Sequence, residues 1–266
     1  MEDTIYEELP VREIIRDKNG CRLSDISKKV IAEISLKIIV NGLELVSILC
    51  LNQQQEELAL GFLYNEGVIN SLADIESIAF NDKMLAVLVK LKEGVAINRQ
   101  ENLRSITSSG GKCFTDINPL KKSQYREVQC EDNFSLNALL DMMASFVTRS
   151  EIFTTIGGVH SVLLYTPDFE LLTEDIGRHN CFDKMTGTML RLNRLDLFSR
   201  GIVFVSGRIS SEIMAKIIRI GVPVLVSKST PTSTAVKLAS QHNVTILGYV
   251  RKTGGFIYSC PERLIP

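Results

Sequence analysis

The stretch Glu174-Asp-Ile-Gly-Arg-His-Asn-Cys-Phe-Asp-Lys184 decides the fold of this chain, because it joins expected strands to an expected helix. Apolar runs at 160–166 and 170–174 predict two strands before it, and residues 180–193 predict the helix. Most of the reactive side-chain types of the chain meet within this stretch. Strand-to-helix junctions in α/β proteins face the ligand crevice, and loops there carry function more often than packing.

Strands and helices continue to alternate toward the C-terminus. A helix is expected at 136–148, with Ser135 as its N-cap. Further strands are expected at 201–206, 222–227 and 244–250, and further helices at 211–220 and 231–241. This alternation predicts a three-layer α/β domain with mostly parallel strands and helices on both faces.

The first half is expected to be a smaller, β-rich α+β domain. Residues 31–40 alternate apolar and polar side chains, Asn41-Gly42 is a strong hairpin signal, and 43–51 form the return strand. An amphipathic helix is expected at 56–65, followed by a second strand pair at 75–80 and 84–91. The polar stretch 121–133 predicts the boundary, with one domain at 1–130 and the other at 131–266.

Composition narrows the class of protein. The 266 residues are 45% hydrophobic and 23% charged, with a net charge of −1, so neither nucleic acid nor an acidic membrane is expected as the main partner. No apolar run approaches the roughly 20 residues that span a bilayer. The acidic N-terminus lacks a signal-peptide core. These features predict a cytoplasmic protein.

Three strand-to-helix turns carry similar chemistry, at 175–180, 206–211 and 227–233. Helix N-termini attract phosphate, and Arg178, Arg208 and Lys228 add cations at the same edge if the strands are parallel neighbours. Thr230 is expected as the N-cap of the third helix, with Pro231 at its first position. One such turn is most simply a helix cap, whereas three together favour an anion or nucleotide site.

Other motifs limit the chemistry. No turn has the Gly-Lys-Ser/Thr ending of a phosphate loop, and Gly177 and Gly207 do not belong to a dinucleotide fingerprint. His160 follows two glycines and is a candidate ligand residue, with a structural role as the alternative. His160 and His179 could form a pair, but no third residue has metal-ligand spacing, so no catalytic metal is expected.

The six cysteines are scattered, which predicts free thiols in a reducing compartment. Cys50 lies in an apolar run and is expected to be a buried hydrophobe. Cys113 lies in a glycine-rich segment, and Lys112 beside it would favour the thiolate. Cys113 is therefore either a nucleophile or an incidental surface thiol.

The chain resembles the formate dehydrogenase accessory sulfurtransferases, the FdhD family. The matching segments cover nearly the whole chain, and the run at 174–184 is the most specific of them. They comprise residues 55–63 with Glu66-Gly67, 157–161, 174–180 with Asp183-Lys184, 206–208 with Ser210 and Glu212, Pro231-Thr232 with Ala235, and 247–251 with Tyr258.

This resemblance implies a cytidine deaminase-like fold for the C-terminal domain and a homodimer. It implies that a cysteine desulfurase loads a persulfide onto Cys113. The sulfur then passes to the molybdenum of the bound bis-molybdopterin guanine dinucleotide cofactor, which formate dehydrogenase requires. The family's cofactor-binding segment maps onto Tyr249, Val250, Arg251, Lys252, Thr253 and Gly254. The anionic parts of the cofactor agree with a site that includes His160, Arg178, His179, Ser206, Gly207, Arg208, Ser227 and Thr230.

One departure from the family pattern leaves alternatives open. Most members carry Cys-x-x-Cys in the loop, whereas this chain has Gly110-Gly-Lys-Cys113. Either Cys113 transfers sulfur alone, or the reaction is weakened or lost, with Cys181 as a possible substitute. The alternative function is a cofactor-binding chaperone without sulfur chemistry. A zinc deaminase is excluded, because Ser161-Val162 follow His160 and no Pro-Cys-x-x-Cys exists.

Overall fold

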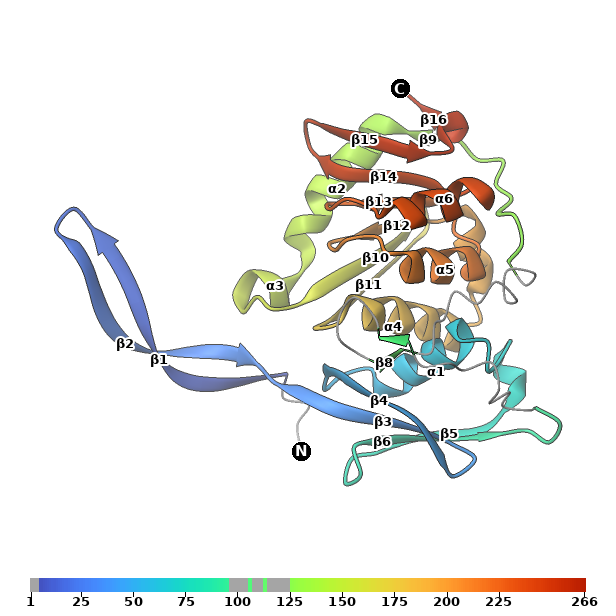
Figure 1. Ribbon diagram of the computed structural model, residues 1–266, viewed down its shortest axis with the longest axis horizontal. Coiled ribbons are helices and arrows are strands. Elements are labelled where there is room, and N and C mark those ends of the chain that lie inside the picture. The colour runs from blue at the N-terminus through green and yellow to red at the C-terminus, as the bar shows by residue number, and fades with distance from the viewer. Residues whose placement is uncertain (1–4, 96–104, 107–111, 114–124) are drawn as a thin grey trace.

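The computed structural model describes residues 5–95 and 125–266, together with the backbone of 105–106 and 112–113. Its largest element is a six-stranded sheet with the order β11-β10-β12-β13-β14-β15 (Figure 1). These strands are β10 (His160–Thr166), β11 (Phe169–Asp175), β12 (Ile202–Val205), β13 (Val224–Ser227), β14 (Thr245–Arg251) and β15 (Gly254–Ser259). The α/β class expected for the second half is confirmed.

The prediction of mostly parallel strands is wrong. Within the six-stranded sheet, only the pairs β12–β13 and β13–β14 are parallel, while β10–β11, β10–β12 and β14–β15 are antiparallel. Two residues join β10 to β11, and two join β14 to β15, whereas a parallel connection needs a dozen or more. Because β11 and β12 both run antiparallel to β10, the carboxyl ends of β11, β12, β13 and β14 share one edge of the sheet.

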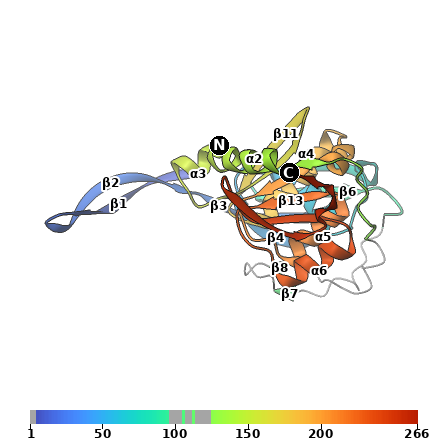
Figure 2. The ribbon, with the colours of Figure 1, turned by 90° about the horizontal axis from the view of Figure 1, so that it is seen from above.

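Helices cover both faces of this sheet, as Figure 2 shows for α2 on one side and α5 and α6 on the other. On one side lies α2 (Leu136–Arg149), which α3 (Glu151–Thr155) follows. On the other lie α4 (Arg178–Arg191), α5 (Ser211–Ile220) and α6 (Ser233–Gln241). Ser135 is the N-cap of α2, as predicted, and accepts a hydrogen bond from the amide of Ala138 at 3.5 Å.

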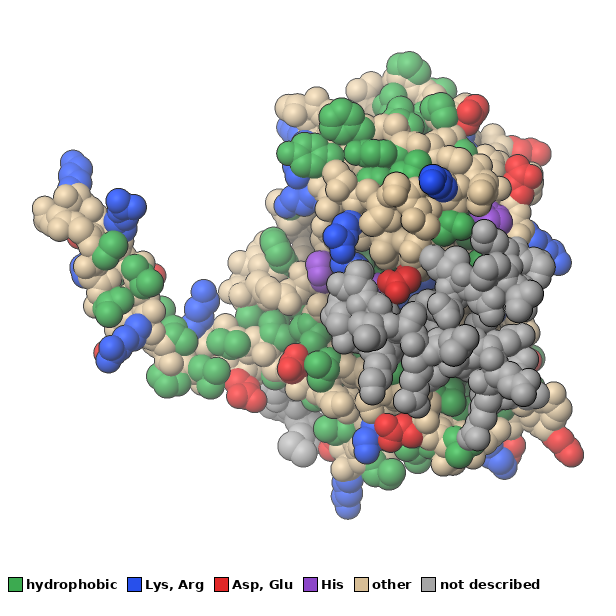
Figure 3. All heavy atoms as spheres, in the orientation of Figure 1, with side chains coloured by type: hydrophobic (Ala, Val, Ile, Leu, Met, Phe, Trp, Pro, Cys, Tyr) green, Lys and Arg blue, Asp and Glu red, His purple; other side chains and the backbone are tan. Residues whose placement is uncertain are grey.

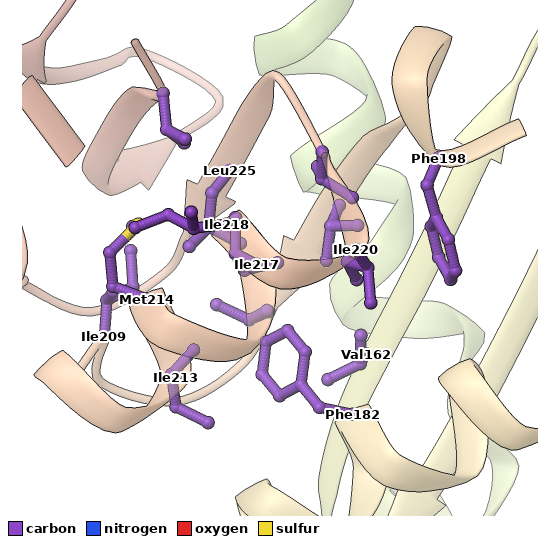
Figure 4. Close-up of a cluster of buried hydrophobic side chains, with 14 of the residues drawn as sticks. Val162, Phe182, Phe198, Ile209, Ile213, Met214, Ile217, Ile218, Ile220 and Leu225 are labelled. Carbon is purple, nitrogen blue, oxygen red and sulfur yellow. The ribbon is translucent and has the colours of Figure 1, made fainter. Parts of the chain in front are cut away.

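The core follows the alternation of side chains along each strand. In β12, Val203 and Val205 face α4–α6, whereas Ile202 and Phe204 face α2. Figure 4 shows the first of these two cores, where Phe182 of α4 meets side chains of α5 and of the sheet. A short parallel pair, β9 (Phe134–Ser135) and β16 (Leu264–Ile265), closes the far end.

A second sheet has the order β4-β3-β6-β5 and confirms the predicted hairpin and strand pair. Its strands are β3 (Glu33–Val40), β4 (Leu43–Leu51), β5 (Ile75–Asn81) and β6 (Ala86–Leu91). Asn41 and Gly42 have φ of 49° and 78°, which suits a two-residue hairpin turn. The predicted helix is α1 (Gln55–Asn65), which packs on this sheet and against α4.

A long hairpin precedes this sheet and was not predicted. Strands β1 (Tyr6–Asp17) and β2 (Gly20–Ile31) pair along their whole length and extend away from the body of the molecule (Figures 1 and 2). Its sequence mixes charged and apolar residues on both faces, so no clean alternation marks it. A second short pair is β7 (Ser105–Ile106) with β8 (Lys112–Cys113).

The remaining elements are short 3-10 helices at Leu72–Asp74, Leu195–Arg200 and Pro261–Arg263. The predicted boundary at 121–133 has no helix or strand in the part that the structure describes, residues 125–133. Val128 already packs with the core beside α4–α6, and the division at residue 130 stays a prediction. Among the described residues, no helix has the length and apolar character needed to cross a membrane.

Candidate functional site

The three predicted turns lie along one edge of the six-stranded sheet. The amide of Ser206 donates to the carbonyl of Ser161 at 3.1 Å, and the hydroxyl of Ser227 donates to the carbonyl of Gly207 at 2.8 Å. The guanidinium of Arg251 donates to the carbonyl of Lys228 at 2.6 Å. We call this edge the rim: residues 175–180, 206–211, 227–233 and 249–254, together with His160. These hydrogen bonds join the second turn to β10, to the third turn and, through the third turn, to residues 249–254. The pairing of Asp175 with His160 places the first turn at the same edge.

A buried ion pair fixes the first turn. Asp175 and Lys184 lie 2.7 Å apart and are both fully buried. Asp175 also accepts hydrogen bonds from the amides of Gly177 at 3.0 Å and Leu51 at 3.2 Å, so it joins the turn to β4. The side chain of Asn180 donates to Asp175 at 2.7 Å and to the carbonyl of Leu49 at 2.8 Å. These residues position the rim and tie it to the second sheet.

Cations gather just outside this turn. The pKa of Arg178 is lowered, first by burial and then by the nearby Arg208, while Glu212 acts in the opposite direction. Arg208 is exposed. Figure 3 shows basic side chains beside a histidine on this face of the molecule. Because two guanidinium groups in proximity repel each other, an anion bound between them would be stabilised.

His160 lies in the middle of the rim. Its Nδ1 is 3.5 Å from the hydroxyl of Ser206, and a Cβ on Gly207 would approach the same nitrogen to 3.2 Å. Glycine at 207 therefore leaves room for the imidazole. Burial, followed by the charge of Arg178, lowers the pKa of His160, so the ring is neutral near pH 7.

His179 is the most perturbed histidine. Burial, followed by the charges of Lys216, Arg178 and His160, lowers its pKa to about 3. Its Nε2 lies 3.3 Å from a carboxylate oxygen of Glu212, but the two groups are not aligned as a hydrogen bond. Neither ring nitrogen finds a hydrogen-bond partner among the described residues. Burial also raises the pKa of Glu212. Both ring nitrogens are buried, so His179 lies behind the surface of the rim and does not present a hydrogen-bonding atom to solvent, in contrast to its predicted place in the binding site.

The third turn corrects the prediction of its helix start. The N-cap of α6 is Thr232, whose hydroxyl accepts a hydrogen bond from the amide of Ala235 at 3.3 Å. Pro231 instead forms a parallel bridge with Ile209, which links the second and third turns. Thr230 is thus exposed on the rim rather than a cap. The first helix also starts earlier than predicted, at Arg178.

The C-terminal segment has mixed exposure. Tyr249, Arg251, Lys252 and Thr253 are exposed, whereas the side chain of Val250 is fully buried in the core beside α2. Val250 therefore holds the segment in place and does not offer its side chain to a ligand. Tyr249 has φ of 55°, and its amide donates to the carbonyl of Ser229 at 2.9 Å, which ties this segment to the third turn.

The structure separates the cysteines by environment. Cys113 pairs with Ser105 through the backbone of β8, and its side chain lies outside the described residues, as do Gly110 and most of the predicted loop. Cys50 is buried, as predicted. Cys181 is also buried, and its sulfur lies 3.3 Å from the carbonyl of His160. Burial, followed by Asp175, raises the pKa of the Cys181 thiol, which disfavours it as a substitute nucleophile.

Comparison with known proteins places this arrangement in a family. The profile of the FdhD/NarQ family matches residues 31–265. The chain belongs to the FdhD/NarQ family. Two of its most similar relatives are both named sulfur carrier protein FdhD. The protein from Bacillus subtilis is 34% identical over 96% of this chain and 97% of its own length, and that from Staphylococcus aureus (strain MRSA252) is 33% identical over 95% of each.

A solved structure agrees with the fold. The crystal structure of a candidate formate dehydrogenase accessory protein from Desulfotalea psychrophila superposes with a TM-score of 0.74. The two sequences are 21% identical, and the match covers 97% of this chain and 99% of the solved chain. At that identity the likeness supports the FdhD-like fold alone. The cytidine deaminase-like layout of the second domain remains a prediction.

Sequence reasoning missed the buried charges behind the rim. The ammonium of Lys216 lies 2.6 Å from both carboxylate oxygens of Asp183, and both side chains are buried. Glu212 and Lys216 occur at helical spacing in α5, which put them on one face of that helix. This spacing could have indicated that Glu212 and Lys216 act together, but it does not show which residues of α4 they contact.

Proposed function

We propose that this FdhD/NarQ protein carries sulfur as a persulfide on Cys113 and delivers it to the molybdenum cofactor during maturation of formate dehydrogenase. The observation that carries the proposal is the single rim of turns and cations in a chain whose full-length relatives are named sulfur carriers. A cysteine desulfurase is the proposed donor and formate dehydrogenase the proposed recipient. The protein would act in the cytoplasm as a homodimer.

The rim suits the nucleotide ends of a bis-molybdopterin guanine dinucleotide cofactor. The phosphate groups of this cofactor are anionic and would lie against Arg178, Arg208 and the turn at Lys228. The neutral imidazole of His160 would offer a hydrogen bond without adding repulsion to these cations, while His179 lies buried behind them. Exposed Lys252 and Thr253 extend the same surface. The cofactor is cargo here, so the molybdenum is the substrate of the transfer.

Loading the carrier is a simple displacement. The thiolate of Cys113 attacks the outer sulfur of the persulfide on the desulfurase, and the bond between the two desulfurase sulfurs breaks. The desulfurase thiolate leaves with the electron pair, and Cys113 becomes the new persulfide. No external oxidant or reductant is consumed, because the outer sulfur keeps its oxidation level.

Release of the sulfur needs two electrons, because the outer sulfur must become sulfide. A second loop cysteine could supply them by closing a disulfide, but this chain has Gly110 at that position. We propose that an external thiol attacks the inner sulfur of the Cys113 persulfide. Sulfide then leaves for the molybdenum, and Cys113 remains in a mixed disulfide with that thiol until a second thiol reduces it.

The test is incubation with a cysteine desulfurase and cysteine, followed by intact mass analysis. The wild type is expected to gain the mass of one sulfur atom, and Cys113→Ala is expected not to. Cys21→Ala is the control, because Cys21 is an exposed thiol in the part of the chain that the structure describes. A sulfur adduct that persists in Cys113→Ala and disappears in Cys21→Ala would show that the carrier is misassigned.

The second candidate function is a cofactor-binding chaperone without sulfur chemistry. The loss of the first loop cysteine at Gly110 favours it. It predicts that Cys113→Ala still restores formate dehydrogenase activity to cells that lack the accessory factor. The sulfur-carrier proposal predicts that this variant fails to do so while it still binds guanine nucleotide.

A further inference from the structure

We infer that Tyr249 and Phe256 form an aromatic platform at the end of the rim, on which a planar heterocycle of the bound nucleotide stacks. This inference rests on the proposed function and adds a ring-binding element to the phosphate-binding turns. Phe256 lies on β15, beyond the segment 249–254 that the family resemblance implies. The platform is defined as the side chains of Tyr249 and Phe256, with the guanidinium of Arg251 beside them.

Both rings of the platform are open to solvent. Tyr249 is 51% exposed and Phe256 is 60% exposed, although both belong to strands of the central sheet. Their ring centroids are 6.3 Å apart, with 38° between the planes. Figure 3 shows hydrophobic side chains gathered over β14 and β15, on the same face as basic side chains and a histidine.

The spacing of the rings decides how a ligand would lie. A flat ring inserted between two others needs roughly 7 Å, because each stacked pair of carbon atoms is separated by about 3.5 Å. The two rings are closer than that, so the ligand ring would lie across them. Exposed aromatic faces of this kind stack nucleobases without regard to which base is present.

The backbone holds the platform in an unusual conformation. Tyr249 has φ of 55°, which is rare for a bulky residue and concentrates at functional sites. Its amide bond to the carbonyl of Ser229 fixes this turn. A Cβ on Gly248 would lie 2.9 Å from Pro231 and 2.8 Å from the ring of Tyr258. The register of β14 against β15 shifts between Gly248 and Arg251, so the chain bulges at Tyr249, whose ring remains in solvent.

Arg251 connects the platform to the phosphate-binding turns. Its guanidinium lies 4.6 Å from the centroid of the Tyr249 ring, and two carbonyls, those of Lys228 and Val250, accept its hydrogen bonds at 2.6 and 2.8 Å. The cation is thus held between the ring and the third turn. A nucleotide whose phosphates lie on the rim would place its base toward Tyr249 and Phe256.

The ring of Phe256 packs against Tyr258 on one side and remains exposed to solvent on the other. Its ring packs edge-on against Tyr258, with centroids 6.5 Å apart and 64° between the planes. Tyr258 is partly buried against the core beside α4–α6. Ile257, the next residue on β15, is 45% exposed and points to the opposite face of the sheet. Ile257 is therefore a matched control for Phe256.

The test compares two probes, GDP and inorganic pyrophosphate, by calorimetric titration of the full-length protein. Phe256→Ala is expected to weaken GDP binding about ten-fold or more, since loss of one stacking partner commonly has this effect. Pyrophosphate binding should be unchanged, and Ile257→Ala should bind both probes as the wild type does. Tyr249→Asn should behave like Phe256→Ala, because asparagine tolerates the positive φ.

The outcomes separate this inference from the proposed function. If the wild type binds neither probe, the rim is not a nucleotide site and both ideas fail. If it binds pyrophosphate as tightly as GDP, or if Phe256→Ala leaves GDP binding intact, the rim stands and the platform is wrong. A change of oligomeric state in Phe256→Ala, seen by light scattering, would assign the patch to contact with a second copy instead.

Discussion

Gly61 of α1 lies directly against the backbone carbonyl of Asp183 of α4, so closely that a Cβ at position 61 would be 1.7 Å from the carbonyl oxygen. The contact is reciprocal, because a Cβ at Gly187 of α4 would be 1.9 Å from the carbonyl oxygen of Glu57 in α1. The two helices therefore touch through their backbones. This contact joins the second sheet to the helix whose first residues form the rim.

Gly61→Ala is expected to destabilise the protein by about 1–3 kcal/mol, because the added methyl forces the helices apart. Intrinsic helix propensity acts in the opposite direction, since alanine is the better helix former. A loss of stability in chemical denaturation would thus come from the clash. Gly187→Ala should show a similar loss, and an unchanged or raised stability in both variants would contradict the close approach.

The buried pair of Asp183 and Lys216 is expected to contribute strongly to the stability of the fold. Among the side chains that the structure describes, Lys216→Met leaves the buried Asp183 carboxylate with the amide of Asn65, at 2.7 Å, as its remaining partner. Breaking such a pair costs about 3–5 kcal/mol. Urea denaturation should show this loss.

The control is Lys90→Met, because Lys90 and Glu76 form an exposed pair at 2.7 Å on the second sheet. Exposed pairs contribute little, so this variant should unfold close to the wild type. The double variant Asp183→Leu/Lys216→Met should lose less stability than the two single variants together. Additive losses would show that the two charges do not depend on each other.

Local patterns predicted the elements of the core but not the connections between them. The hairpin at Asn41-Gly42 and the helix capped by Ser135 depend on residues close in sequence, and both were found as predicted. The prediction of mostly parallel strands was wrong because the periodicity of apolar residues does not show which strands pair or in which direction they run. The long hairpin β1–β2 was not predicted because neither of its faces is uniformly apolar.

Local sequence patterns likewise predicted some parts of the candidate site and not others. The three turns were found from their Gly, Ser and Arg content. Their common edge was expected only for parallel neighbouring strands, whereas in the structure β10 lies between β11 and β12 and runs antiparallel to both, which still brings the turns to one edge. The start of α6 was placed wrongly, because Thr230 and Thr232 are both good caps and only the bridge from Ile209 to Pro231 selects the second. The neutral state of His179 depends on burial and on charges from another helix, which no local pattern contains.

Thiol reactivity should follow burial among the cysteines whose side chains are described. Cys21 is exposed and is expected to react rapidly with an alkylating reagent in the native protein. Cys50 and Cys181 are buried, and burial raises the pKa of both thiols, that of Cys50 to about 12. They should react only after denaturation. Peptide mass mapping after timed labelling measures this difference, and rapid native labelling of Cys181 would reopen its role as a nucleophile.

The stability of the protein is expected to depend on pH through His179. Its pKa is about 3 in the folded state, against 6.5 in the unfolded chain, because burial and the charges of Lys216, Arg178 and His160 disfavour its protonated form. Glu212 faces the same ring at 3.3 Å, and the pKa of His179 is lowered nonetheless. Between pH 6.5 and pH 3 the unfolded chain therefore binds a proton that the folded protein does not, and stability falls as the pH falls.

His179→Gln removes this proton uptake, so the stability of the wild type relative to the variant should decrease on acidification. The expected change is about 2 kcal/mol between pH 6.5 and pH 5, since the slope is about 1.4 kcal/mol per pH unit. Urea denaturation of both proteins at a series of pH values measures it. Parallel stability curves across this range would mean that His179 binds a proton as readily in the folded protein as in the unfolded chain, and the rim would then gain a positive charge in mild acid.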